Sequence, residues 1–414
     1  MTSEAARSQL APTRNLTALL VAYFGVQLVV NAGNSGAAQF LLPLQLDALD
    51  PAAKVAHLGI VNSVAAVLAI VAQPLWGWLS DRTRSRLGRR VPWVLGGVVG
   101  LAACFVALAL SSSFLAILVF ASSIQVFYSM VAGPLFALVP DRTPIDKRGL
   151  FSALGGIGIY LGIAAGTFAA SPFAEAIPVG YLVLAAVLVV LATPLAFLVR
   201  RDSRALPRPG HVPVRRVLGE FWVSPREFPD FWWAFAARLI LMTGFWGISS
   251  FLLYQLQDYI GLSTGDAARL VPVMSAVLIV ALVVAIVPAG WVSDRIGRRK
   301  PFVVGGSFAI ALSAVVPLVW PTLPALFTSL VVAGLGLGVY MSVDQALMTQ
   351  VLPNASSAGK DLGLLNIAQA GGQVLAPVVA SVVITAAGYR AEWAFVAVMA
   401  VIGGLAFLPM RSVR

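Results

Sequence analysis

G-W-L-S-D-R-T-R-S-R-L-G-R-R (residues 77–90) and G-W-V-S-D-R-I-G-R-R-K (residues 290–300) are two copies of one charged cassette, each set between long apolar stretches. Asp81 and Asp294 lie 213 positions apart, and the same offset carries Pro140 onto Pro353. Nearer the start of each copy the offset is 211, because F-L-L-P-L-Q-L-D (40–47) matches F-L-L-Y-Q-L-Q-D (251–258). A repeat that extends over several helices predicts a chain built from two copies of one unit.

The composition places these units in a membrane. Hydrophobic residues make up 59% of the chain and charged residues only 11%, whereas soluble domains carry about 25% charged residues. A spanning helix needs roughly 20 apolar residues, and continuous apolar runs exclude a transmembrane barrel, whose strands alternate polar and apolar positions. We therefore predict an all-α membrane protein with twelve spans, six in each copy. The predicted spans are 15–46, 56–80, 91–111, 113–140, 149–171, 177–199, 230–260, 266–293, 301–320, 323–352, 361–387 and 391–410.

The spans divide the chain into four segments. Residues 1–14 are polar and precede the first span without a cleavable apolar region, so we expect a cytosolic tail. Residues 15–199 and 230–414 are predicted to be the two six-helix bundles. Residues 200–229 are rich in Pro and Arg, and we expect them to form a flexible cytosolic linker between the bundles.

The net charge of +11 reflects topology and not nucleic-acid binding. If the N-terminus is cytoplasmic, the inner segments hold 24 of the 28 Lys and Arg residues, and only Lys54, Arg269 and Arg390 lie outside. Basic residues concentrate on the cytoplasmic side of membrane proteins. This distribution predicts a multi-pass protein of the cell membrane with both termini in the cytoplasm.

The sequence offers no cluster that would suit catalysis or metal binding. Cys104 is the lone cysteine, so neither an intrachain disulfide nor a thiol metal site is expected. His57 and His211 fall in loops without other metal ligands nearby in the sequence. No span combines residues in the spacing of a metalloprotease or of a Ser-His-Asp set. We expect neither an enzyme nor a cofactor-dependent protein.

Each cassette is expected to form a gate on the cytosolic side. Its glycine would allow close helix approach, and its arginines would anchor in phospholipid headgroups. A helix N-terminus stabilises a nearby carboxylate, so Asp81 is expected to face the start of the eleventh span near Asp361 and Gly363. By the same argument Asp294 would face the start of the fifth span near Gly149. The charges in the loop that enters the fifth span fit either a gate or a solvated turn. The gate candidates are Gly77, Asp81, Arg82, Arg86, Arg90, Asp141, Arg148, Gly290, Asp294, Arg295 and Arg298.

Twelve spans, two six-span repeats and this cassette after the second and eighth spans resemble the major facilitator superfamily. The resemblance covers essentially the whole chain. It implies two pseudo-symmetric six-helix bundles around a central cavity lined by the first, fourth, seventh and tenth spans. It also implies secondary active transport by alternating access of a central site.

A longer string, S-D-R-T-R-S-R-L-G-R-R-V-P-W (80–93), is similar to the loop of the glycoside-pentoside-hexuronide cation symporters and of the sucrose-type proton symporters. The acidic pair that sodium-coupled melibiose carriers place in the second span is absent, because this span offers Asn62, Ser63 and Gln73. Sodium coupling by that route is therefore not expected.

The fifth span lacks the glycine run broken by Gly-Pro that is expected in drug exporters. Gly158, Gly162 and Gly166 instead repeat every four residues without an intervening proline. Small residues at this spacing predict a smooth helix face that packs closely against a neighbour.

Only two charges, Arg238 and Asp344, are expected to lie deep within predicted spans, so Asp344 is expected to be the only interior carboxylate. Arg238 is eight residues into the seventh span, and Asp344 is nine residues before Pro353 in the tenth. At 1.5 Å per residue both lie roughly 12–14 Å from the inner edge, so we expect them to pair. The pair could pin two helices structurally. Alternatively, Asp344 could serve as a coupling group that takes up a proton when the pair separates. Val131 occupies the equivalent place in the first copy, so the charge belongs to one half only.

Neutral polar side chains at comparable depth offer the paired donors and acceptors that sugar hydroxyls require. Each alone could equally form an interhelical hydrogen bond. Trp246 could provide an apolar platform for a sugar ring. The substrate-binding candidates are Gln27, Asn31, Gln125, Tyr128, Trp246, Tyr340, Gln369 and Gln373.

The sequence therefore favours a secondary active transporter of a small solute, most simply a proton-coupled sugar or glycoside symporter. Two alternatives stay open: proton-coupled efflux of a hydrophobic drug or metabolite, and a membrane sensor that binds a ligand without moving it. The expected partners are a small-molecule substrate, a proton as coupling ion and the lipid bilayer, without nucleic acid. We expect a monomer, because a two-bundle chain can enclose its own pathway.

Overall fold

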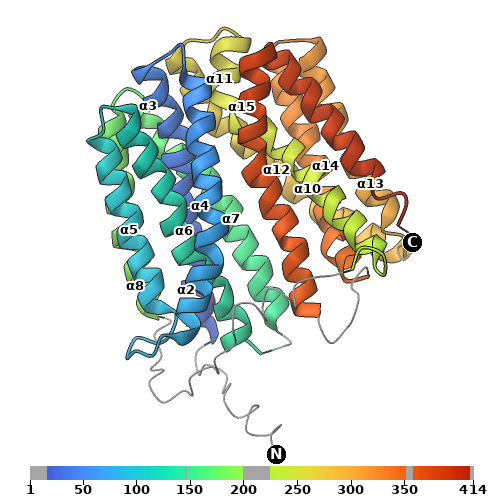
Figure 1. The fold of residues 1–414 in the computed structure, drawn as a ribbon, viewed down its shortest axis with the longest axis horizontal. Helices are drawn as coiled ribbons and strands as arrows, with labels where there is room; N and C mark the ends of the chain where they lie inside the picture. Colours follow the sequence, from blue (N-terminus) through green and yellow to red (C-terminus); the bar gives the residue numbers. More distant parts are fainter. Residues whose placement is uncertain (1–15, 145–146, 199–223, 351–357, 411–414) are drawn as a thin grey trace, which may run out of the picture. The chain divides into compact units, whose positions relative to one another are not determined.

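The computed structural model describes residues 16–144, 147–198, 224–350 and 358–410, and these are helical with short connections (Figure 1). The side chains of some residues at helix ends, including Arg148, Gly149 and residues 358–364, are not described. No strand occurs in the described residues, which confirms the all-α prediction. They group into two compact units. We call the helices α2 to α8 the N-terminal bundle and the helices α10 to α15 the C-terminal bundle. Residues 55–63 belong to the N-terminal bundle by this definition, but they cluster with the second compact unit.

The N-terminal bundle holds six apolar spans. The first span is continuous but changes its winding, from an α-helix to a π-helix and back. The elements are α2 (Leu16–Asn34), the π-helix η1 (Ser35–Leu41), α3 (Leu42–Leu49), α4 (Lys54–Arg82), α5 (Val91–Ala109), α6 (Phe114–Arg142), α7 (Arg148–Ala170), the short η3 (Ser171–Phe173) and α8 (Ile177–Leu198). All six spans are long and apolar enough to cross a membrane.

The C-terminal bundle repeats this order, and its first span also contains a π-helix, which here lies at the end of the span. The elements are α10 (Pro229–Ser250), α11 (Leu252–Tyr254), the π-helix η4 (Gln255–Tyr259), α12 (Thr264–Ile296), α13 (Lys300–Val319), α14 (Leu323–Gln350) and α15 (Ala358–Leu405). The helix α15 contains a non-helical residue, Gly388, with φ 78° and ψ −179°. This glycine separates the predicted eleventh and twelfth spans, because its left-handed φ is costly for other residues.

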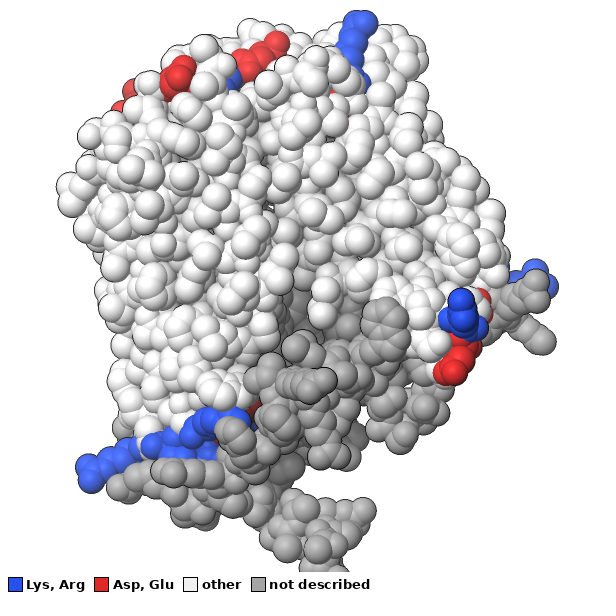
Figure 2. Space-filling model, viewed as in Figure 1, with Lys and Arg blue, Asp and Glu red and all other residues white. Residues whose placement is uncertain are grey.

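The two ends of the N-terminal bundle differ in charge. The first cassette begins in the last turns of α4 and leads into α5, and α6 ends at Arg142 on the same side. The ion pair of Asp47 with Lys54, at 3.1 Å, joins α3 to α4 at the opposite side. Figure 2 shows blue basic side chains gathered at one end of this bundle, with mostly white, uncharged surface along its length. This banding fits helices that cross a bilayer with their charges at the ends.

Glycines let α7 approach α2 closely. A Cβ atom added at Gly162 would come within 2.5 Å of the Leu28 carbonyl oxygen, and one at Gly166 within 2.1 Å of the Ala32 carbonyl oxygen. Ser35 Oγ donates a hydrogen bond of 2.9 Å to the Ile163 carbonyl oxygen across the same contact. The predicted close-packing face of the fifth span is therefore confirmed. It packs against the first span, where association in lipid relies on close van der Waals contact.

Adding one methyl group to this face should destabilise the bundle. We expect Gly166→Ala to lower stability by about 1–3 kcal/mol, because backbone atoms of α2 must move to admit the methyl group. Gly156, in the same helix, has open space where its Cβ would lie. We expect Gly156→Ala to be neutral or stabilising by up to about 1 kcal/mol, since alanine favours helix. Thermal melting of the purified variants in detergent measures both; equal melting temperatures would contradict the packing argument.

Candidate functional site

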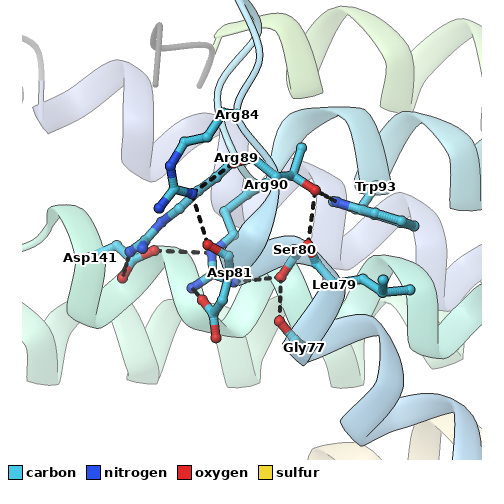
Figure 3. Close-up of polar contacts among 10 residues, drawn as sticks. Gly77, Leu79, Ser80, Asp81, Arg84, Arg89, Arg90, Trp93 and Asp141 are labelled. Carbon is cyan, nitrogen blue, oxygen red and sulfur yellow. Dashed lines mark hydrogen bonds and ion pairs between the residues drawn. The ribbon is translucent and has the colours of Figure 1, made fainter. Parts of the chain in front are cut away.

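The first cassette forms a partly buried ionic network at the end of the N-terminal bundle (Figure 3). Arg90, just before α5, is its centre, with a side chain only 5% exposed. Its guanidinium contacts Asp81 Oδ1 at 2.7 Å and Asp141 Oδ2 at 3.0 Å, and it also donates to Ser80 Oγ. A guanidinium presents five donors in a rigid fork, so one side chain can serve three acceptors. Arg90 thereby ties the ends of α4 and α6 to the start of α5.

Further contacts hold the cassette loop in this position. Arg89 pairs with the other carboxylate oxygen of Asp141. Trp93 Nε1 donates to Thr83 Oγ1 at 2.7 Å, and Arg84 donates to the carbonyl oxygen of Asp81 at 2.8 Å. Sequence reasoning missed Arg89 and Trp93. The sequence did carry a signal, because both cassettes contain an Arg-Arg pair near their end. Only the folded loop shows that Arg89 and Arg90 both face the carboxylate of Asp141.

The second cassette forms a weaker version of this network. Arg299 stands where Arg90 stands in the first copy, but its guanidinium is 3.8 Å from Asp294, whose side chain is 78% exposed. The residue that the 213-position offset sets opposite Asp141 is Asn354, which lies outside the described residues. The second copy therefore lacks the acid that completes the first network.

The cassette also repeats an aromatic contact at the helix end. The Arg82 guanidinium lies over the Trp78 ring, 3.8 Å from its centroid, and Arg295 lies 5.4 Å from that of Trp291. Both tryptophans are exposed. Tryptophan and arginine at the end of a span are typical anchors at the membrane surface. This contact supports the predicted role of the cassette arginines at the headgroups.

Part of the gate hypothesis is wrong and part stays a prediction. A Cβ at Gly77 would meet no atom within 4 Å, and one at Gly290 would meet only Ser342, at 3.8 Å. Close helix approach in the described structure therefore does not explain these glycines; the Gly77 carbonyl oxygen instead accepts from Ser80 Oγ at 2.9 Å. The expected partners of Asp81 and Asp294, namely Asp361, Gly363 and Gly149, lie outside the residues whose side chains are described, as does Arg148. Arg86 and Arg298 are exposed.

The predicted ion pair is present in the C-terminal bundle. Arg238 Nη2 on α10 lies 2.8 Å from Asp344 Oδ2 on α14, and both side chains are 1% exposed. Arg238 also donates to Gln369 Oε1 and, at 3.3 Å, to the Leu365 carbonyl oxygen, both on α15. One guanidinium thus joins three helices. Tyr340, one turn before Asp344, is completely buried beside the carboxylate.

A neutral polar cluster lies in the N-terminal bundle. Asn31 Nδ2 donates to the Gln27 carbonyl oxygen at 2.8 Å, and the Tyr128 hydroxyl donates to Asn31 Oδ1 at 3.0 Å. Gln27 and Asn31 are 2% and 4% exposed, and Gln27 Nε2 forms no hydrogen bond of good geometry among the described residues, although the Tyr23 hydroxyl lies beside the Gln27 side chain. The cluster is therefore buried but has unused donor capacity. Of the other candidates, Gln125 and Trp246 are half-buried and Gln373 is exposed.

The expectation that Asp344 is the only interior carboxylate is wrong. Glu392, in α15 just beyond Gly388, is completely buried, and Gln255 Nε2 donates to its Oε2 at 3.0 Å. In the sequence it stands at the second position of the last apolar run, where a charged residue is normally at the membrane surface. Its burial arises because η4 of another span covers it, which the sequence pattern does not show.

The sequence model of a family described as MFS/sugar transport protein matches residues 27–408. The chain belongs to this family, within the major facilitator superfamily (MFS). It is a multi-pass membrane transporter of the MFS type, as the resemblance implied.

Curated relatives of this MFS transporter match over shorter stretches. It is similar to an uncharacterized symporter of Synechocystis, 30% identical over 131 residues, which are 26% of this chain and 24% of that protein. It is also similar to a sucrose transport protein of Arabidopsis thaliana, 30% identical over 159 residues, 31% of each chain. The chain spans less than a third of the length of either relative.

Solved structures show the same fold over nearly the full chain. A bacterial homolog of the human lysosomal transporter Spinster has a TM-score of 0.73 and 17% identity, covering 97% of this chain and 98% of that one. A peptide transporter crystallised with sulfate has a TM-score of 0.74 and 17% identity, covering 99% and 98%. The nucleoside transporter NupG has a TM-score of 0.74 and 16% identity, covering 95% and 100%. At these identities the likeness establishes the MFS fold alone.

The two cassettes of this MFS transporter should differ in their contribution to stability. We expect Arg90→Ala to cost about 3 kcal/mol, because it removes a buried guanidinium that serves Asp81, Asp141 and Ser80 together and leaves Asp141 with Arg89 alone. Arg299→Ala should cost less than about 1 kcal/mol, since its pair is long and largely exposed.

Melting temperatures of the purified variants provide the measurement. The loss of about 3 kcal/mol corresponds to a fall of roughly 5 °C or more for Arg90→Ala. Arg90→Lys should fall almost as far, because an ammonium group cannot serve three acceptors in a fixed fork. Similar losses for Arg90→Ala and Arg299→Ala would show that the ion-pair geometry does not decide stability here.

Proposed function

We propose that this MFS transporter moves a sugar or glycoside together with a proton, by alternating access of a central site. The carrying observation is the ion pair of Arg238 and Asp344, which is completely buried in helices of a membrane bundle. Ionisable residues within spans are costly and mark ion or substrate pathways. The family description and the printed names of two relatives, a symporter and a sucrose transport protein, support the same direction.

Within the pair, Asp344 is the group that can exchange a proton. Arginine stays protonated in proteins, whereas a carboxylate becomes neutral when it takes up a proton. Arg238 has further acceptors in Gln369 and the Leu365 carbonyl oxygen. If Asp344 is protonated, Arg238 can therefore keep hydrogen bonds to α15 while its tie to α14 weakens. Protonation would thus change how the tenth span is held without leaving a buried guanidinium unpartnered.

The neutral cluster of the N-terminal bundle suits a sugar. Sugar hydroxyls both donate and accept hydrogen bonds, and amides and a phenol offer both. Gln27 Nε2 has donors to spare, and the Tyr128 hydroxyl oxygen can accept a further bond. We assign Gln27, Asn31 and Tyr128 to substrate binding. We also propose a cell-membrane location with cytoplasmic termini, supported by the distribution of 24 of the 28 basic residues.

The coupling role of Asp344 can be separated from a structural one. In liposomes with an imposed proton gradient, Asp344→Asn should abolish uphill sugar accumulation and leave sugar counterflow, which needs no net proton movement. Accumulation by this variant would remove Asp344 from coupling.

The double variant Arg238→Gln with Asp344→Asn provides the control. Replacing both partners of a buried pair often leaves stability nearly unchanged, whereas removing one leaves an uncompensated charge. If the pair couples transport to protons, the double variant is folded but still fails to accumulate sugar. Restored accumulation would show that the pair only fastens helices.

Ligand binding should stabilise the folded transporter selectively. We expect sugars or glycosides from a panel to raise its melting temperature, and lipophilic cations not to. Gln27→Met should weaken the binding of a stabilising sugar about five- to tenfold, because one hydrogen bond is worth about 1 kcal/mol.

Gln45→Met is the matched control in the same bundle. Gln45 Nε2 is already occupied by the carbonyl oxygens of Leu108 and Ser111, at 2.9 and 3.2 Å. This variant should lose stability but keep the sugar-induced shift. Stabilisation by lipophilic cations alone would favour efflux of a hydrophobic compound, and sugar binding without flux in liposomes would favour a sensor.

A further inference from the structure

A carboxyl and a primary amide are buried together in the C-terminal bundle, away from Arg238. Glu392 on α15 and Gln255, the first residue of η4, are both 0% exposed. Gln255 Nε2 donates to Glu392 Oε2 at 3.0 Å. A short turn after η4 leads into the start of α12, and the second cassette lies at the other end of α12. The contact between Glu392 and Gln255 is therefore at the end of the bundle opposite that cassette.

The remaining oxygens of this contact are unsatisfied. Glu392 Oε1 and Gln255 Oε1 have no hydrogen-bond partner within the described residues. Among the described residues, no Lys or Arg forms an ion pair with Glu392. An ionised Glu392 would therefore be a buried charge without compensation, which is one of the most costly arrangements in a protein interior.

The titratable neighbours do not supply a positive charge. Tyr389 on α15 lies near Glu392, and its hydroxyl donates at 2.8 Å to Oδ2 of Asp258, an exposed residue of η4. Tyr254 on α11 also lies close by. Arg390, two positions before Glu392, is exposed. These neighbours therefore supply no buried positive charge beside Glu392.

One proton resolves both unsatisfied oxygens. A protonated carboxyl has a donor oxygen and an acceptor oxygen, and a primary amide has a donor nitrogen and an acceptor oxygen. With the proton on Glu392 Oε1, the O–H can donate to Gln255 Oε1 while Gln255 Nε2 keeps donating to Glu392 Oε2. The ionised form can make only the second of these bonds.

The first copy of the repeat has no counterpart. The offsets of 211 and 213 set Tyr181 and Val179 opposite Glu392, and neither these two residues nor Gly180 between them is a carboxylic acid. A Cβ added at Gly180 would lie 3.0 Å from the Leu41 side chain of η1, so that site is closed by apolar packing. The acid is therefore a feature of the C-terminal bundle, placed against a π-helix, and π-helical turns often occur at functional sites.

We propose that Glu392 is a proton-binding site, and that its bound proton fastens the π-helical turn of the seventh span to the twelfth span. Loss of this proton leaves one hydrogen bond and an uncompensated charge, so it loosens η4 from α15. This site is separate from Asp344. It adds a second protonation step to the proposed proton-coupled cycle, but the proton binding itself does not depend on what is transported.

The test is the pH dependence of stability and the infrared signature of a protonated carboxyl, measured on the full-length purified protein. The folded chain holds a proton that the unfolded chain releases near neutral pH, so the melting temperature should fall as the pH rises. Glu392→Gln imitates the protonated acid, because its amide can make both hydrogen bonds with Gln255. In the unaltered protein the melting temperature should fall by roughly 3 °C or more as the pH rises. We expect Glu392→Gln not to show this fall and to keep the stability that the unaltered protein has at low pH.

Infrared spectra give the second readout. The carbonyl band of a protonated carboxyl should be present at neutral pH and absent in Glu392→Gln, whereas Glu392→Ala should be less stable at every pH. Asp344→Asn should keep the dependence of stability on pH that Glu392 causes, so failure of the coupling proposal does not affect this result. An unchanged pH dependence in Glu392→Gln, or a Glu392→Gln protein that does not fold, would overturn the proposal.

Discussion

The cost of burying charge in a low-dielectric interior governs the polar architecture of this transporter. Arg238 and Asp344 are each 1% exposed and lie 2.8 Å apart, and the same guanidinium reaches two acceptors on α15. Each group can stay ionised in the interior only because the opposite charge lies beside it. The pair therefore makes the positions of three helices interdependent, and any change in the charge of Asp344 must change how they are held.

The two copies share their scaffold and differ in their chemistry. Both have a π-helix in the first span, a stacked Trp-Arg contact at the cassette and an arginine directed at the cassette aspartate. Among the described residues, the carboxylates buried within spans belong to the second copy, because Val131 is set opposite Asp344 and no acid lies among residues 179–181, which the offsets set opposite Glu392. The fully formed cassette network belongs to the first copy. A duplicated fold thus keeps its packing while each half acquires its own polar sites.

This division gives the proposed cycle distinct parts. Neutral donors and acceptors are buried in the N-terminal bundle, where unused hydrogen-bonding capacity suits a neutral, hydroxyl-rich ligand. Groups that can carry a proton are buried in the C-terminal bundle. A symporter needs both kinds of site, since the substrate is recognised by hydrogen bonds and the ion by a change of charge.

The sequence by itself determined the all-α membrane fold, the twelve spans, the duplication and the pairing of Arg238 with Asp344. These follow from long apolar runs, a fixed repeat offset and the high cost of lone charges in lipid, all of which act along the chain. Only the tertiary structure decided that Arg89 and Arg90 share Asp141, that Gly77 does not serve close packing, and that Glu392 is buried. These depend on which helices face each other, and side-chain contacts between distant segments leave no periodic trace in the sequence. A residue at the end of an apolar run can be exposed or buried, and the neighbouring helix decides which.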